Sequence, residues 1–193
     1  MRFCRFFYYA LFFVFSETSF SATAQNLVRD GQFKEGIQHW TVLLSDSQFP
    51  IKAQVIEHSD DYGTYGLADN YVNTNFVELD AASAIQQIIA TKANNKYVLT
   101  LAYSHRPNAG KKQLVVLVDQ EVVHTETVDN NSSVGTFKYK TIYFTPEQDN
   151  SKLSFYAVSL DGPEDQGILI TDLSCEIAAE INLLDALSPS KTH

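Results

Sequence analysis

Three charged side chains interrupt the apolar strands of this sequence and are its strongest candidates for chemistry. The segment FVELD alternates, which places Val77 and Leu79 on a core face and Glu78 and Asp80 on the opposite face. The segment YVLTLAYSHR alternates bulky with smaller residues as far as Arg106. Two carboxylates separated by one residue on a strand lie roughly 6–7 Å apart, within the range of acid–base pairs in glycosidases. With the arginine they also form a set of hydrogen-bonding groups for neutral hydroxyls.

Two other interpretations of these charges stay open. In the first, Glu78 and Arg106 form a structural ion pair across neighbouring strands, which is worth little at a wet surface. In the second, the acids are catalytic, although neighbours on one strand rarely flank a scissile bond from both sides. The sequence has no G-x-S-x-G turn, phosphate-cradling glycine loop or metal-ligand histidine spacing. We therefore expect a protein that is not an enzyme, with a glycoside or ester hydrolase as the less favoured alternative.

The elements that position these residues are short strands separated by turn signals every 8–12 residues. This pattern predicts an all-β fold, a single-domain antiparallel β-sandwich of the jelly-roll type with about ten strands. The principal strands are expected at 26–28, 40–44, 51–57, 76–80, 85–89, 97–106, 114–118, 122–128, 137–145, 153–158 and 168–177. In the strand 137–145, Lys138 and Lys140 are expected on the outer side, and in the strand 153–158 Phe155 is expected to face the core with Tyr156 opposite. Phe33 and Trp40 are predicted to fill the core beside the loop that they flank.

The segment 58–75 lacks apolar periodicity but contains Tyr62, Tyr65 and Tyr71. A loop of this length in a compact domain is usually functional or disordered, and its aromatic residues argue against disorder. Two interpretations remain open: a loop that contacts a ligand, or a loop whose tyrosines cover the edge of the sheet.

The first 24 residues have the pattern of a secretory signal peptide. Arg2 and Arg5 precede an apolar run at 6–15, and Ala22-Thr23-Ala24 is a small-residue cleavage site. The run is too short to span a bilayer, which takes ~20 apolar residues. We expect a signal peptide at 1–24, the sandwich at 25–178 and a tail with a possible short helix at 179–193, in a secreted or periplasmic protein.

Charge and cysteine content argue against a nucleic-acid partner and against a disulfide within the chain. The formal net charge is −9, and it becomes −10 once Arg2, Arg5 and Glu17 leave with the signal peptide, so a nucleic-acid partner is not expected. Cys175 is then the single cysteine, which rules out an intramolecular disulfide. Its place in an apolar alternation predicts a buried, unreactive thiol.

Three blocks of the sequence resemble the galactose-binding-like jelly-roll domains. The blocks are NLVRDGQFKEGIQHW, VELDAASAIQQIIATKANNKYVLTLAYSHR and GILITDLSCEI, in the order in which that family has its opening, middle and closing patterns. The family includes many non-catalytic carbohydrate-binding modules and related secreted bacterial proteins. The resemblance implies sugar binding on a concave sheet face or at loop tips, and a structural calcium where the first and last strands meet.

For calcium, the resemblance points to Glu35 and Asp172. The family's acidic residue after the phenylalanine is replaced here by Lys34, and a lysine in the first shell would repel Ca²⁺. Two alternatives remain open: a calcium ion held by Glu35 and Asp172, or a lysine ammonium paired with Asp172 in place of the ion.

Sugar recognition needs hydrogen-bonding groups for hydroxyls and a flat apolar surface for the ring. The candidates for the first are the two carboxylates and the guanidinium, and those for the second are tyrosines: Glu78, Asp80, Arg106, Tyr65, Tyr71 and Tyr156. We expect a secreted, non-catalytic carbohydrate-binding protein. The alternative is an adhesion or host-interaction module that binds a host or envelope protein.

Overall fold

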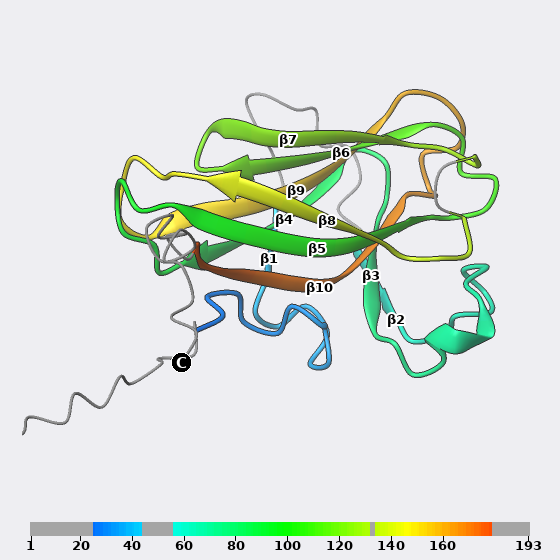
Figure 1. Ribbon diagram of the computed structural model, residues 1–193. Coiled ribbons are helices and arrows are strands. Elements are labelled where there is room, and N and C mark those ends of the chain that lie inside the picture. Colours follow the sequence, from blue (N-terminus) through cyan, green and yellow to red (C-terminus); the bar gives the residue numbers. More distant parts are fainter. Residues whose placement is uncertain (1–24, 44–55, 132–133, 179–193) are drawn as a thin grey trace, which may run out of the picture.

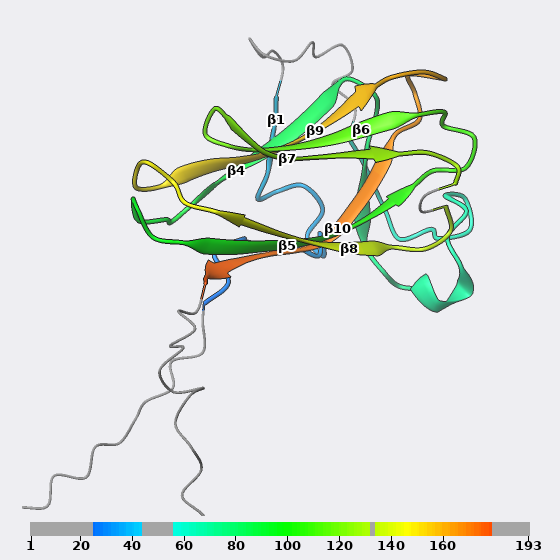
Figure 2. The same cartoon turned by 45° about the horizontal axis from the view of Figure 1, so that its top comes forward.

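Two five-stranded antiparallel sheets packed face to face make up the described part of the chain. The computed structural model describes residues 25–43, 56–131 and 134–178, and these contain ten strands and one short 3-10 helix. Figure 1 shows the strands of both sheets, and Figure 2 shows the two layers nearly edge-on. The predicted all-β antiparallel sandwich is thus confirmed. The segments predicted as signal peptide and tail lie outside the described residues.

The order of strands differs from their order in the chain, as in a jelly roll. In hydrogen-bonding order, sheet I consists of β1 (Thr41–Val42), β4 (Ser83–Ile89), β9 (Ser151–Ser159), β6 (Lys112–Val118) and β7 (Glu121–Val128). Sheet II consists of β2 (Ile56–Ser59), β3 (Phe76–Leu79), β10 (Ile168–Ile177), β5 (Tyr97–His105) and β8 (Lys138–Phe144). The 3-10 helix η1 covers Asp69–Tyr71. Of the strand predicted at 51–57, only its last two residues lie within the described part, where β2 begins.

The core lies between the sheets and follows the predicted alternation. Val77 and Leu79 of β3 and Leu99 and Leu101 of β5 are fully buried there. Phe155 of β9 meets them from sheet I. Burying each such side chain contributes roughly 1.5–3 kcal/mol, so reversing the face of any of these strands would cost the fold heavily.

The N-terminal segment closes one side of the sandwich instead of forming the strand predicted at 26–28. Leu27 N donates to Cys175 O at 2.7 Å, and Leu173 N donates to Gly31 O at 3.0 Å, so the segment runs beside β10. A Cβ on Gly31 would lie 1.9 Å from Leu173 O, which is why only glycine fits this approach. Gln87 of β4 ties the segment to sheet I, since its Nε2 donates to Arg29 O at 3.0 Å.

Three side chains predicted to be buried are buried. The rings of Phe33 and Trp40 lie 5.6 Å apart and are packed into the main core. Cys175 is a free, fully buried cysteine. Burial raises the pKa of its thiol to about 12, which leaves almost no reactive thiolate at neutral pH.

Strand β8 has the predicted alternation, but its faces are reversed. Lys140 lies opposite the core residue Leu101, whereas Tyr139 lies opposite Ala102 on the outer face of sheet II. Lys140 can lie on the inner side because β7 and β8 are the last strands of their sheets and flank the open side of the sandwich. There Lys140 Nζ donates to Glu126 Oε2 of β7 at 2.9 Å. Inward-pointing charges of this kind protect exposed strand edges from pairing with other chains.

Candidate functional site

The predicted pair of Glu78 and Arg106 exists, but it is not an open site. Arg106 Nη1 lies 2.7 Å from Glu78 Oε2, and Gly167 N donates to Glu78 Oε1 at 2.7 Å. Glu78 is 0% exposed, and 23% of the Arg106 side chain is exposed. The expectation of an open polar face at Glu78 was therefore wrong. The carboxylate joins the start of β10 to the end of β5 from within, and only the arginine reaches the surface.

The loop with the three tyrosines covers the outer face of sheet II. The Arg106 guanidinium lies 4.9 Å from the centre of the Tyr65 ring, and Tyr65 OH donates to Glu57 Oε2 at 2.7 Å. Tyr71 OH accepts from Phe137 N at 3.0 Å. The loop lies at the right-hand end of the sandwich in Figure 1. A second apolar cluster forms there, made of Tyr65, Leu67, Phe76, Ala102, Phe137 and Leu169. Of the two interpretations of this loop, the packing matches the covering loop.

Both carboxyl groups of the predicted site hold their protons more tightly than usual. Burial raises the pKa of Glu78 to about 7, against the opposing effects of the Gly167 N–H and Arg106. Burial, with the nearby charge of Glu57, raises the pKa of Asp80 to about 6. Asp80 Oδ1 is buried and has no hydrogen-bond partner among the described residues. Perturbed acids often mark functional sites, but buried structural networks produce the same shifts.

Stability should fall as Glu78 ionises, and Glu78→Gln should remove this dependence. The pKa is about 7 in the folded chain against an ordinary 4.5, so the unfolded chain gives up its proton first as the pH rises. The stabilising contribution is complete below pH 4.5 and is lost through pH 7, a change of about 3 kcal/mol. Urea unfolding at pH 4 to 8 should show wild type losing stability relative to Glu78→Gln. Parallel pH profiles would contradict the raised pKa.

Tyr156, expected beside these residues, lies elsewhere. It is on β9 of sheet I and 3% exposed. It packs with Ala84, Val115 and Leu117 on the outer face of that sheet. Alternation along β9 was predicted as observed, with Phe155 facing the core. The layer to which β9 belongs is a matter of strand order, which alternation does not encode.

The two residues expected to bind calcium are each engaged with other groups. Glu35 Oε2 lies 2.9 Å from His39 Nε2. Asp172 accepts from Gln32 Nε2 at 2.9 Å and from Tyr139 OH at 3.0 Å. Within the described ranges there is no cluster of three or more His, Cys, Asp or Glu side chains able to hold a metal ion. Calcium binding by Glu35 and Asp172 stays a prediction.

The residues that sequence reasoning missed are two tyrosines on the outer face of β8. Tyr139 is 70% exposed and Tyr143 is 60% exposed, with the exposed Thr141 between them. Four residues of strand separate their Cα atoms by about 13 Å. We call Tyr139, Thr141 and Tyr143 the tyrosine ledge. The Tyr-x-Thr-x-Tyr alternation was visible in the sequence, but placing the lysines on the outer side turned these rings toward the core.

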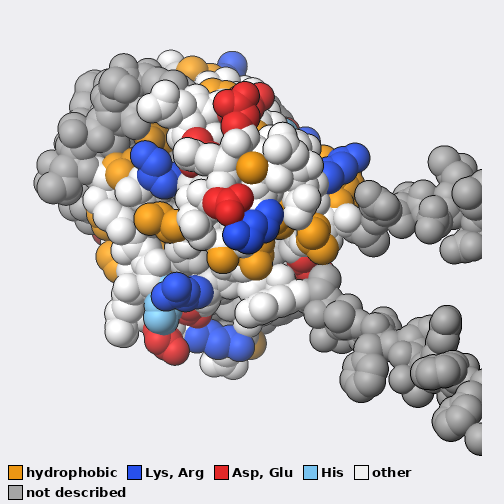
Figure 3. All heavy atoms as spheres, turned by 90° about the vertical axis from the view of Figure 1, so that its left-hand side faces the viewer, with side chains coloured by type: hydrophobic (Ala, Val, Ile, Leu, Met, Phe, Trp, Pro, Cys, Tyr) orange, Lys and Arg blue, Asp and Glu red, His pale blue; other side chains and the backbone are white. Residues whose placement is uncertain are grey.

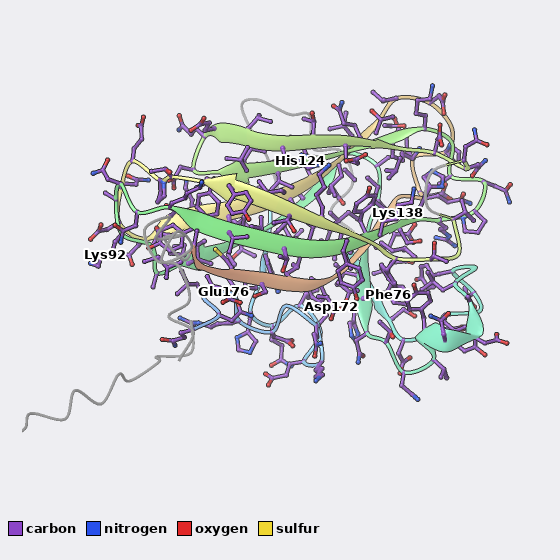
Figure 4. All side chains as sticks on the ribbon, viewed as in Figure 1. Phe76, Lys92, His124, Lys138, Asp172 and Glu176 are labelled. Atoms are coloured by element: carbon purple, nitrogen blue, oxygen red, sulfur yellow. The ribbon has the colours of Figure 1, made fainter. Side chains whose placement is uncertain are left out.

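Polar groups of neighbouring strands flank the tyrosine ledge. Thr141 lies opposite Thr100 of β5, which in turn lies opposite Ser174 of β10. Asp172 and Glu176 lie on either side of Ser174 along the same strand, and Figure 4 shows both on β10. The ledge thus combines exposed rings with hydroxyl and carboxylate groups on one side of the sheet.

A groove adjoins the tyrosine ledge at the open side of the sandwich. One hollow of about 590 Å³ lies between the β6–β7 turn and the β8–β9 loop, and a second of about 400 Å³ adjoins it. Both are lined by Glu121, Val123, Phe144 and Thr145, and the second also by Tyr143. We call the two hollows together the edge groove. Figure 3 looks onto the left-hand end of the molecule in Figure 1, where acidic, basic and apolar side chains are interspersed.

Comparisons with known proteins show the fold and not a family. No family model matches the chain, and no curated protein matches it. A Stig cyclase, Fisc from Fischerella sp. TAU in complex with (3Z)-3-(1-methyl-2-pyrrolidinylidene)-3H-indole, superimposes with a TM-score of 0.57 at 13% identity. That match covers 81% of this chain and 100% of the cyclase. The CBM22-1 xylan-binding domain from Paenibacillus barcinonensis Xyn10C superimposes with a TM-score of 0.51 at 14% identity, covering 81% and 97%.

The chain therefore has the two-sheet antiparallel jelly-roll fold of these proteins. Proteins named as a cyclase and as a xylan-binding domain share this architecture, so the fold alone does not decide the function. In the part of the chain that the structure describes, no helix has the length and apolarity to cross a membrane.

Proposed function

We propose that this protein is an exported, non-catalytic carbohydrate-binding protein and that the tyrosine ledge is its sugar site. The observation that carries the proposal is the pair of exposed rings, Tyr139 and Tyr143, on one face of an edge strand. A xylan-binding domain of similar fold supports carbohydrate as the ligand class. The signal-peptide pattern of residues 1–24 supports export.

The chemistry of the ledge suits sugar rings. The C–H faces of a pyranose are apolar and stack on an aromatic ring, while its hydroxyls need donors and acceptors at the side. The rings of Tyr139 and Tyr143 offer the first, and Thr141 with the β10 side chains offers the second. Tyr139 is held in place because its OH donates to Asp172 Oδ2, which reduces the entropy lost on binding.

The state of the acidic residues favours binding over catalysis. A general acid must reach the bond that it protonates, and Glu78 is fully buried and bonded to Arg106 and Gly167. Among the three charged residues of the predicted site, Arg106 alone is partly exposed. We assign this cluster to holding the loops in place, and the sugar to the ledge.

Glycan binding should be lost when the rings of the ledge are removed. Affinity electrophoresis in gels that contain soluble forms of xylan, cellulose, β-glucan, chitin or alginate identifies a polysaccharide that retards the protein. We expect Tyr143→Ala and Tyr139→Ala each to weaken its binding at least ~10-fold, equivalent to about 1.4 kcal/mol. Tyr143→Phe keeps the ring and should bind nearly as well as wild type.

A matched control is Ile88→Ala on β4, since Ile88 is 63% exposed but lies on sheet I. It should leave binding unchanged. If wild type and Tyr143→Ala are retained equally, the sugar site is not the ledge. If no polysaccharide retards the wild-type protein, the proposed function is wrong.

A further inference from the structure

We infer that the ligand is a linear glycan and not a single sugar. Several consecutive sugar units are bound, from the tyrosine ledge over the strand edge into the edge groove. This inference rests on the proposed function and specifies the ligand class of the same site.

The length of the ledge is the first reason. Tyr139 and Tyr143 are separated by about 13 Å along β8, so one sugar ring cannot stack on both. Thr141 lies between them on β8, with Thr100 opposite it on β5, and both are polar and not aromatic. A chain that places one unit on each ring must therefore continue across these hydroxyls, which can bond the intervening unit.

Continuity with the edge groove is the second reason. Tyr143 belongs to the ledge and also lines the smaller hollow of the groove, so a chain leaving this ring enters the groove directly. The larger hollow, of about 590 Å³, has the size of a small-molecule site. It offers abundant hydrogen-bonding groups to hydroxyls, from Asp119, Gln120, Glu121, Glu147, Gln148 and Lys152.

The walls of the groove are fixed by the fold, so this part of the site is preformed. In the β6–β7 turn, Asp119 N donates to Lys152 O at 2.7 Å, and Lys152 N donates to Asp119 Oδ1 at 2.9 Å. On the other side, the Phe144 ring stacks on Tyr97 with centroids 5.6 Å apart. A preformed groove costs little ordering on binding, which favours its use by an extended ligand.

The two halves of the site differ in chemistry, and this predicts a dependence on chain length. The ledge contributes ring stacking, whereas the groove contributes hydrogen bonds from charged side chains. A ligand of one or two units fills one half only. A longer chain fills both, and the two binding energies then act together.

The test uses oligosaccharides of one to six units, prepared by partial hydrolysis of the polysaccharide that retards the wild-type protein in electrophoresis. Calorimetry should show affinity rising at least ~10-fold between two and five units. Reducing the terminal sugar of the six-unit chain to its alditol should leave affinity unchanged, because the ledge is open along its length. Tyr139→Ala and Glu121→Gln should each weaken the six-unit chain at least ~3-fold and flatten the dependence on length.

Other results would overturn the inference while leaving the proposed function in place. A monosaccharide that binds as tightly as the six-unit chain would show that one half suffices. A Glu121→Gln variant with the full length dependence would remove the groove from the site. Thermal unfolding checks that each variant is folded, and Glu121 is exposed, so its change should not affect stability. If no glycan binds at all, the proposed function itself fails.

Discussion

Replacing Arg106 with alanine is expected to destabilise the protein by about 1–2 kcal/mol more at pH 8 than at pH 5, because the buried carboxyl group left without its cationic partner must take up a proton. Glu78 is fully buried, and Arg106 is its only cationic partner at salt-bridge distance among the described residues. At pH 8 the carboxyl group, with a pKa of about 7, is mostly ionised. Removing the guanidinium also takes away the group that packs on the Tyr65 ring at 4.9 Å.

The loss should shrink at low pH. At pH 5, below the pKa of about 7, Glu78 is protonated in the folded protein, so little charge is left for Arg106 to neutralise. The remaining cost is the contact with Tyr65. Urea unfolding of wild type and Arg106→Ala at pH 5 and pH 8 measures both effects.

The matched control is Lys92→Ala, which breaks an ion pair of equal length at the surface. Lys92 Nζ and Asp149 Oδ2 lie 2.7 Å apart, but their side chains are 70% and 48% exposed. Water screens this pair, so its loss should cost less than about 1 kcal/mol at both pH values. If the two variants lose equal stability at pH 8, Glu78 is in contact with water, and the assignment of a buried pair is wrong.

Gly167→Ala is the second substitution with a large expected effect, a loss of about 3 kcal/mol or more. A Cβ on Gly167 would lie 1.7 Å from Leu79 O and 2.9 Å from the Cα of Asp80. These are backbone atoms, so no side-chain rotation relieves the clash, and the start of β10 must move away from β3. Overpacking of this kind typically costs 1–3 kcal/mol and occasionally more. The displacement also breaks the bond from Gly167 N to Glu78 Oε1.

Gly63→Ala is the control for this prediction. The nearest atom to a Cβ on Gly63 is Asp61 Oδ1 at 3.6 Å, an ordinary contact, and the residue lies in the loop over sheet II. Its replacement should change stability by less than about 1 kcal/mol. Thermal unfolding of both variants gives the comparison. A Gly167→Ala protein as stable as Gly63→Ala would mean that the two strands separate at little cost.

Strand faces were largely predictable from the sequence because alternation is a local property. Val77 and Leu79 were assigned to the core from a five-residue pattern, and both are fully buried there. The assignment of Phe155 to the core of β9 was confirmed in the same way. Exposing a bulky apolar side chain to solvent costs so much free energy that the strand cannot turn its other face to the core.

The candidate site was harder to predict because exposure depends on what covers a face. Glu78 was correctly placed on the outer face of its sheet, but the loop with Tyr65 and the segment before β10 bury it. Tyr143 was assigned to the wrong side, because lysines normally mark the solvent face. Strand β8 is an exception, since an edge strand lets Lys140 reach both Glu126 and solvent from the inner side.

The sequence by itself determined that this chain is an antiparallel sandwich and which residues of β3 and β9 fill its core, and it placed Glu78 and Arg106 in one cluster. Only the tertiary structure decided that Glu78 is fully buried, that Tyr156 belongs to the opposite layer, and that Tyr139 and Tyr143 face outward. The physical reason is that alternation records which residues share a side. The order of strands and the packing of loops then decide which side meets water.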